Sequence, residues 1–257
     1  MLSKILRNIS LLFKPGVEIS YSKLNAYLSC PYKYLLVYEK GMKVPPNPYI
    51  SLGQSVHRAL EGFHLKKAGD IDDLMDCYNA SWVNEGFNSP QQAFEFFEKG
   101  RRMLESYYRD SLNLKTEVLF VEKEFRFKLG KHLVRGIMDR VDRHPDGKYE
   151  VIDYKTHSEM WKQDKADADL QLSVYALGCE RALGFKPDLL TFYFVAAGER
   201  LSTTRSSLQL AAAARTAADI AGRISCRVFT PNPSFCPRCD FKKTCPRSTA
   251  KKEPVQK

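Results

Sequence analysis

Gly136-Ile-Met-Asp139-Arg-Val-Asp142 and Tyr149-Glu-Val-Ile-Asp153-Tyr-Lys155-Thr156 are the two stretches that decide the fold of this 257-residue chain. Apolar residues from Leu133 to Val141 predict one strand, and the second stretch predicts another. Between them, His144-Pro-Asp-Gly147 has the Pro and Gly typical of a turn. We therefore expect an antiparallel hairpin whose strands carry acidic residues at the end of apolar runs.

Asp153 and Lys155 are two residues apart, so they point to the same face of their strand. Burying either charge alone is costly, so the pair needs a partner or a function. One interpretation is a buried salt bridge, which the D-x-K spacing alone favours. The other is a metal site, in which Asp139 and Asp153 hold Mg²⁺ or Mn²⁺ through oxygen while Lys155 orients a water or stabilises a phosphate.

The composition favours a soluble globular protein with a polyanionic partner. Hydrophobic residues make up 44% of the chain, the net charge is +10 and the pI is about 9.2. Nucleic acid is the usual partner of such a chain, and an acidic membrane surface is the alternative. No stretch approaches the roughly 20 apolar residues of a membrane span. Met1–Lys14 lacks a cleavage site and is interrupted by basic residues, so we interpret it as an amphipathic helix or leader of a cytoplasmic protein.

The remaining patterns predict an α/β fold with a central mixed sheet flanked by helices. We expect helices at 23–29, 51–64, 167–183 and 208–224, two or three helices within 70–112, and strands at 116–128, 187–195 and 200–204. The strands within 117–155 form an antiparallel meander, and the strand at 187–195 can run parallel to one of them after a helical crossover. The helical region at about 66–112 carries no motif and is interpreted as an insertion or cap over the sheet.

Two further polar positions lie on predicted helices. Gln171 and Tyr175 are four residues apart and share one helix face, where they could reach a substrate or make an ordinary helix–helix hydrogen bond. His57 lies beside the apolar stripe of the helix at 51–64. A lone histidine in such a place is more often structural than a ligand.

The cysteines indicate a metal site near the C-terminus. Cys236, Cys239 and Cys245 form a C-x₂-C-x₅-C pattern, and Cys30, which is also followed by proline, is the best fourth ligand. Disulfides are not expected in a reducing compartment, so such a cluster favours metal. From residue 223 onward there are nine basic and two acidic residues, which gives +7 of the total +10 and predicts a phosphate-binding surface.

Taken together, these motifs resemble the RecB-like branch of the PD-(D/E)XK nucleases, specifically its iron–sulfur members. That group includes the nuclease domain of AddB and the small iron–sulfur nucleases of CRISPR adaptation. The resemblance covers residues 20–247. The matching positions, in chain order, are His57, Gly136 to Arg140, Asp153 to Lys155, Gln171 with Tyr175 as a Q-x₃-Y motif, and the four cysteines, Cys30, Cys236, Cys239 and Cys245, as the split pattern that holds a 4Fe–4S cluster.

The resemblance implies a restriction-endonuclease-like core with a C-terminal iron–sulfur cysteine knuckle. A leader at 1–19 would precede a single nuclease domain at 20–247, in which Cys30 and residues 230–247 form the iron–sulfur module, and a basic tail would follow at 248–257. The implied ligands of Mg²⁺ or Mn²⁺ are His57, Asp139, Asp153 and the Tyr154 carbonyl. The implied catalytic residues are Lys155, Asp139, Asp153, Gln171 and Tyr175.

The function that follows is metal-dependent hydrolysis of DNA, most simply by a single-strand exonuclease in repair, recombination or CRISPR adaptation. The expected partners are DNA with single strands or free ends, together with a helicase or a CRISPR integrase. A non-catalytic DNA-binding component of a helicase–nuclease assembly is the alternative, and the D-x-K strand disfavours a zinc-knuckle adaptor. Four thiols also suit Zn²⁺, so zinc is the rival of the cluster.

Overall fold

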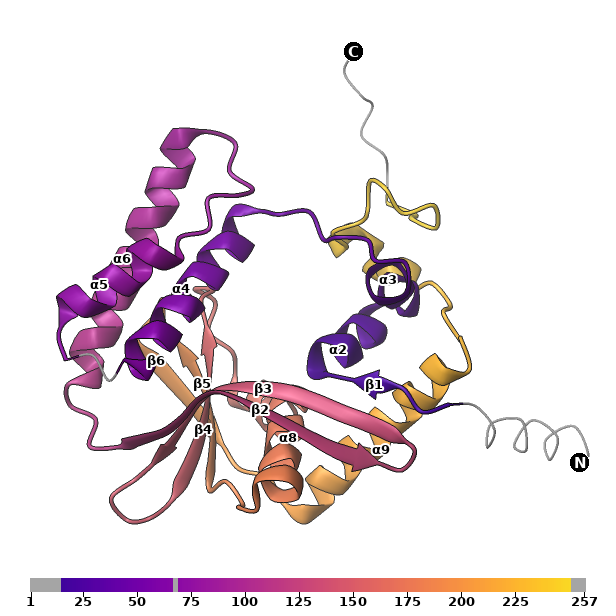
Figure 1. Cartoon of the computed structure of the whole chain (residues 1–257). Helices are drawn as coiled ribbons and strands as arrows, with labels where there is room; N and C mark the ends of the chain where they lie inside the picture. Colours follow the sequence, from indigo (N-terminus) through magenta and orange to yellow (C-terminus); the bar gives the residue numbers. More distant parts are fainter. Residues whose placement is uncertain (1–14, 67–68, 251–257) are drawn as a thin grey trace, which may run out of the picture. The chain divides into compact units, whose positions relative to one another are not determined.

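The computed structural model describes residues 15–66 and 69–250 of the chain (Figure 1). Its strands are β1 (Glu18–Ile19), β2 (Glu117–Leu129), β3 (His132–Arg143), β4 (Tyr149–Lys155), β5 (Leu189–Phe194) and β6 (Glu199–Thr203). Its helices are α2 (Tyr21–Ser29), α3 (Pro31–Tyr34), η1 (Leu35–Glu39), α4 (Pro48–Leu65), α5 (Ile71–Ser81), α6 (Pro90–Ser111), α7 (Gln163–Asp167), α8 (Leu170–Gly178), η2 (Cys179–Leu183), α9 (Ser207–Ser225) and η3 (Pro233–Arg238). The helix or leader expected at Met1–Lys14 and most of the expected basic tail lie outside the described residues. Among the helices within the described ranges, none combines the length and apolarity that a membrane crossing needs.

The sheet is mixed, with strand order β1-β3-β4-β5-β6 and with β2 paired to β3. Strands β3 and β4 are antiparallel, β4 and β5 are parallel, and β5 and β6 are antiparallel. The parallel pair is connected through α8, because a parallel connection needs a crossover of this kind. The mixed sheet flanked by helices that the sequence predicts is therefore confirmed, including the parallel strand at 187–195.

The contacts within the chain divide it into two compact units. Among the described residues, the smaller unit consists of 15–45, 126–135 and 211–250, and the larger unit consists of 46–66, 69–125 and 136–210. Strands β2 and β3 contribute residues to both. The predicted limits of a single nuclease domain, 20–247, stay a prediction.

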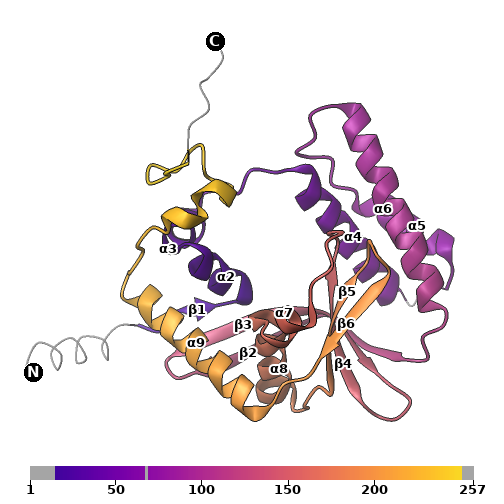
Figure 2. The same cartoon turned by 180° about the vertical axis from the view of Figure 1, so that it is seen from behind.

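In the larger unit, helices cover both faces of the sheet, and successive side chains of β4 point to opposite faces. Ile152 and Tyr154 face a core shared with α4, α5 and α6, which contains Leu60, Tyr78 and Leu104. Asp153 and Lys155 face the opposite way, toward α8. Helices α5 and α6 lie beside α4, as Figures 1 and 2 show from opposite sides, and α7 lies beside β6 (Figure 2). The motif-free region at 66–112 thus forms one wall of the apolar core.

Gly136, the first residue of the motif on β3, leaves room for an aromatic ring. A Cβ atom at this position would lie 2.3 Å from the ring of Phe125, and a Cβ at Gly178 on α8 would lie 2.6 Å from the same ring. The ring of Phe125 also meets that of Tyr175 edge to face, with centroids 6.1 Å apart. The two glycines therefore let Phe125 pack between β3 and α8, where it supports the helix that carries Gln171.

The smaller unit joins the N-terminal helices to the C-terminal segment. The Tyr27 hydroxyl donates to the Val228 carbonyl at 2.5 Å, and Asn232 donates through its side-chain amide to the Ser29 carbonyl at 2.9 Å. Helix α2 ends at Ser29, and Pro31 begins the next helix, because proline fits the first turn but cannot continue a helix. This junction brings Cys30 to the C-terminal cysteines.

Two elements differ from the sequence-based prediction. The helix expected at 167–183 begins at Leu170, because the Asp169 side chain caps it by accepting from the Leu172 amide at 3.1 Å. It passes into the π-helical turn η2 and ends at Gly184, whose φ of 80° is left-handed. Glu18 and Ile19, within the predicted leader, form β1 and pair with Leu133 and Val134 in parallel.

Candidate active site

Asp139 on β3 and Asp153 on β4 lie side by side on neighbouring strands of the central hairpin. The antiparallel ladder pairs Arg140 with Ile152, and Asp139 and Asp153 flank that pair on their respective strands. The Tyr154 backbone N–H donates to Asp139 Oδ2 at 2.8 Å, which fixes this carboxylate against β4. The hairpin predicted from sequence therefore does bring the two carboxylates together.

Asp153, Lys155, Gln171 and Tyr175 form one connected polar array. Lys155 Nζ lies 2.5 Å from Asp153 Oδ2 and donates to Gln171 Oε1 at 2.9 Å. Gln171 Nε2 donates to Asp153 Oδ1 at 2.5 Å and to the Tyr175 hydroxyl at 2.9 Å. The Tyr175 hydroxyl in turn donates to Asp153 Oδ1 at 3.3 Å. The four-residue spacing on α8 thus places both polar side chains on the Asp153 carboxylate.

The electrostatics of the array are unfavourable for two ionised acids. Burial, followed by the charge of Asp153, raises the pKa of Asp139 well above its usual range. The side chain of Asp153 is 3% exposed, and that of Asp139 is 13% exposed. Two carboxylates so close together in a dry site call for positive charge beyond what one lysine supplies.

His57 reaches the same carboxylates from α4. Its Nδ1 atom lies 3.4 Å from Asp139 Oδ2, and its ring meets that of Tyr154 edge to face at 6.0 Å. Burial lowers the pKa of His57 against the opposing pull of the Asp153 charge. A neutral imidazole can offer a nitrogen lone pair to a metal.

Glu122 on β2 is a site residue that the sequence reasoning missed. Burial, then the charges of Asp139 and Glu61, raises the pKa of Glu122 to about 7, so its carboxyl group shares the field of Asp139. Its φ of 45° lies in the left-handed region, which is unusual for a residue other than glycine and breaks the alternation of the strand. Alternation along a strand could therefore not predict the direction of this side chain. The one sequence feature that could have pointed to Glu122 is that it is an acid after the apolar residues of the strand.

Asp139, Asp153 and His57 have the side chains that a divalent metal ion takes as ligands, although they are not arranged around one point. In the described ranges 15–66 and 69–250, no group of three or more His, Cys, Asp or Glu side chains is arranged to hold a metal ion. Asp153 Oδ2 is buried and meets no donor in hydrogen-bond geometry, so its contact with Lys155 Nζ is an ion pair alone. Two carboxylates, one of them with this unsatisfied oxygen, and a neutral histidine are a fitting set for Mg²⁺ or Mn²⁺.

Arg140 anchors a buried hydrogen-bond network next to the array. Its guanidinium donates to both Asp142 oxygens at 2.5 Å and to the Tyr107 hydroxyl at 2.7 Å. The Tyr107 hydroxyl is 2.9 Å from that of Tyr154, the residue between Asp153 and Lys155. Burial and then the charge of Arg140 lower the pKa of the neighbouring His64 to about 3. The network therefore ties α6 to β3 and β4 beneath the site.

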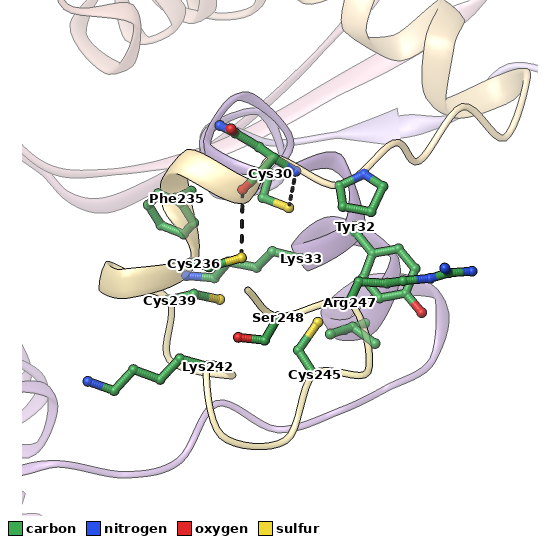
Figure 3. A pocket seen from close by; sticks show the side chains of 13 residues that line it. Cys30, Tyr32, Lys33, Phe235, Cys236, Cys239, Lys242, Cys245, Arg247 and Ser248 are labelled. Carbon is green, nitrogen blue, oxygen red and sulfur yellow. Dashed lines mark hydrogen bonds between the residues drawn. The ribbon is translucent and has the colours of Figure 1, made fainter. Parts of the chain in front are cut away.

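The four cysteines of the predicted cluster line one pocket in the smaller unit. Cys30, Cys236, Cys239 and Cys245 are all free thiols, and their sulfur atoms point toward one another in this pocket (Figure 3). The Asn232 backbone N–H donates to Cys30 Sγ at 3.3 Å. Lys33, Lys242 and Arg247 also line this pocket. The described thiols are not arranged around a metal ion, but four thiols with an amide donor and cations nearby are the number and type of ligand that an anionic iron–sulfur cluster takes.

Comparison with known proteins agrees with these observations. A family model described as the PD-(D/E)XK nuclease superfamily matches residues 18–246. The chain also resembles streptococcal proteins that are named as a subunit of an ATP-dependent helicase/deoxyribonuclease. It is 28% identical over 158 residues to the one from Streptococcus equi subsp. zooepidemicus (strain MGCS10565), a match that covers 56% of this chain and 14% of that protein. It is 27% identical over 168 residues to the one from Streptococcus pyogenes serotype M49 (strain NZ131), which covers 60% of this chain and 16% of that protein.

A solved structure shares the fold. The crystal structure of a candidate exonuclease from Eubacterium rectale superposes with a TM-score of 0.54 over 84% of each chain, at 11% sequence identity. At this identity the likeness is one of fold. The chain spans about a seventh of the length of the streptococcal relatives, 14% and 16% in the two matches.

Proposed function

Because the chain belongs to the PD-(D/E)XK nuclease superfamily, we propose that it is a metal-dependent nuclease that hydrolyses phosphodiester bonds in DNA. The observation that carries this proposal is the array in which Gln171 holds Lys155 beside the buried carboxylate of Asp153, with the half-buried Asp139 next to it. A structural salt bridge would need only one of those acids. The second acid, Asp139, costs free energy through its raised pKa, and such arrangements are typical of functional sites.

The site residues have separate roles in metal binding, charge stabilisation and support. Asp139, Asp153 and His57, with the Tyr154 carbonyl, would hold Mg²⁺ or Mn²⁺, which when bound polarises a phosphate and lowers the pKa of a water. Lys155 stabilises the charge that develops on the phosphate oxygens, and Gln171 fixes its ammonium group at 2.9 Å. Tyr175 supports Gln171 and Asp153 through its hydroxyl.

The substrate we propose is single-stranded DNA with a free end. The net charge of +10 supports a polyanionic substrate. The streptococcal relatives are named as subunits of a helicase/deoxyribonuclease, which supports a role in repair or recombination beside a helicase. A second candidate biological role is CRISPR adaptation with an integrase partner. It is supported by the resemblance in the cysteine pattern alone.

We further propose a 4Fe–4S cluster in the pocket of Figure 3, held by Cys30, Cys236, Cys239 and Cys245. The cluster would cross-link residue 30 to residues 236–245 and so close a loop of some 200 residues. By the chain-entropy model of a cross-link, this stabilises the fold by about 5 kcal/mol. The role is structural, because the cysteines and the carboxylate array belong to different units.

The test is hydrolysis of end-labelled linear and closed circular single-stranded DNA with Mg²⁺ or Mn²⁺, with Lys155→Ala as the matched variant. We expect the linear strand to be degraded and the variant to be inactive while still binding DNA. Cleavage of the circle would instead indicate an endonuclease. No hydrolysis of either substrate by the intact protein would favour the non-catalytic DNA-binding role.

A further inference from the structure

The loop that follows the catalytic strand carries an ordered pair of stacked rings. Directly after Lys155, the segment from Thr156 to Lys162 leaves the sheet, and His157 lies on its exposed surface. The rings of His157 and Trp161 are 5.4 Å apart at an interplanar angle of 30°, which is a stacked arrangement. Neither residue belongs to any of the sequence motifs.

The indole of Trp161 is fixed from below by the core of the sheet. It meets the rings of Phe192 and Phe194 edge to face, with centroids 4.8 Å and 5.7 Å away. Both phenylalanines are fully buried on β5, which is parallel to β4. Because an edge-to-face contact fixes ring orientation, Trp161 is held as a rigid platform with His157 stacked on it.

Lysines surround this platform. Lys165 Nζ lies 3.6 Å from the centroid of the Trp161 ring, and Lys155 Nζ lies 5.6 Å from the same centroid. Lys162 is also exposed on the segment, whose acid is Glu159. A single indole is therefore in contact with the lysine of the active site and with a second, solvent-exposed lysine.

We propose that the exposed ring of His157, stacked on Trp161 behind it, forms a stacking subsite for a nucleobase of single-stranded DNA close to Lys155. Proteins that bind single strands combine aromatic rings, on which bases stack, with cations that follow the phosphates. Bases within a duplex are already stacked on their neighbours, so this subsite selects single strands and unpaired ends. The inference rests on the proposed function and adds a base-binding subsite to it.

The experiment uses the fact that the chain has only two tryptophans, Trp82 and Trp161. In the Trp82→Phe variant all indole emission comes from Trp161, and in the Trp161→Phe variant it comes from Trp82, whose ring stacks on Phe87. Fluorescein-labelled oligothymidylate is titrated in EDTA, and anisotropy reports binding while indole emission is recorded. We expect emission of Trp161 to be quenched at saturation and that of Trp82 to be unchanged.

A second arm locates the base. Oligothymidylates with one abasic nucleotide at successive positions are compared on the wild type and on Trp161→Ala. Stacking of one base on an aromatic ring corresponds to about 5- to 150-fold in affinity. We expect one abasic position to weaken binding by about that factor in the wild type and to have no further effect in Trp161→Ala.

The outcomes separate the two proposals. Binding with unchanged Trp161 emission, or an abasic scan whose profile is the same in Trp161→Ala, would overturn the stacking subsite and leave the nuclease standing. Absence of DNA binding by the wild type would overturn both.

Discussion

Lys155 Nζ donates to Gln171 Oε1 at 2.9 Å, so an amide from α8 fixes the position of the ammonium group at the end of β4. The other end of the same amide donates to Asp153 at 2.5 Å, and Gln171 therefore sets the spacing between lysine and carboxylate. Substitution of Gln171 should therefore disturb the position of the Lys155 ammonium group while leaving its charge in place.

Gln171→Ala should lower the rate of DNA hydrolysis by about 100-fold, because a small displacement of a catalytic group has an effect of this size. DNA affinity should change little, since Lys155 and its charge remain. Tyr175→Phe is the matched control: it removes the 3.3 Å hydrogen bond to Asp153 and the 2.9 Å one from Gln171, but it leaves the contact of Gln171 with Lys155 and should have a smaller effect. Single-turnover rates would measure both, and a Gln171→Ala rate within about a factor of two of the wild type would contradict the positioning role.

Asp139→Asn should stabilise the metal-free protein by about 1 kcal/mol while abolishing hydrolysis, as is usual when a strained active-site charge is removed. Burial and the Asp153 charge raise the pKa of Asp139 in the folded state. The folded protein therefore binds more protons than the unfolded chain between the two pKa values, and the wild type loses stability as the pH rises through that window. The gain from asparagine should grow as the pH rises through that window and shrink toward about pH 4, the usual pKa of an aspartate.

Urea unfolding in EDTA over this pH range measures the effect of Asp139→Asn. Added Mg²⁺ or Mn²⁺ should raise the stability of the wild type and not that of the variant, because an ion that binds only the folded state stabilises it. A variant less stable than the wild type in EDTA near neutral pH would show that the two acids do not repel each other in the folded protein.

Gly136→Ala should destabilise the protein by about 1–3 kcal/mol, since its Cβ would lie 2.3 Å from the buried ring of Phe125. Gly222→Ala is the matched control: this helical glycine has nothing within 4 Å of its added Cβ, so alanine should stabilise α9 by up to about 1 kcal/mol. Thermal melts of the two variants should therefore shift in opposite directions. A Gly136→Ala variant with the wild-type melting temperature would mean that Phe125 does not need this space.

Sequence patterns predicted the parts of the site that depend on regular periodicity. Alternation along β4 put Asp153 and Lys155 on one face, and the four-residue spacing put Gln171 and Tyr175 together; the hydrogen bonds of the array follow from those two rules. The mixed sheet followed from the order of apolar runs and from the crossover before β5.

The parts that could not be predicted depend on irregular backbone or distant packing. Glu122, whose pKa is raised by burial and then by the Asp139 charge, has a left-handed φ of 45°, which no propensity favours. The start of α8 depends on the Asp169 cap rather than on the apolar pattern around it. Trp161 is oriented by Phe192 and Phe194 on β5, some 30 residues later in the chain, so its role required the tertiary structure.

Cys239→Ala should remove the iron and the brown colour of the protein and lower its stability by up to about 5 kcal/mol, the value for a cross-link that closes a loop of this length. Cys226→Ala is the matched control, because Cys226 is a free thiol near the end of the same unit that does not line the pocket. It should keep the iron and the wild-type melting temperature. Metal analysis of the protein purified without oxygen decides between iron and zinc, and zinc at one equivalent without sulfide would replace the cluster by a four-thiolate zinc site. Equal iron content in the two variants would instead mean that the pocket of Figure 3 is not where the iron is bound.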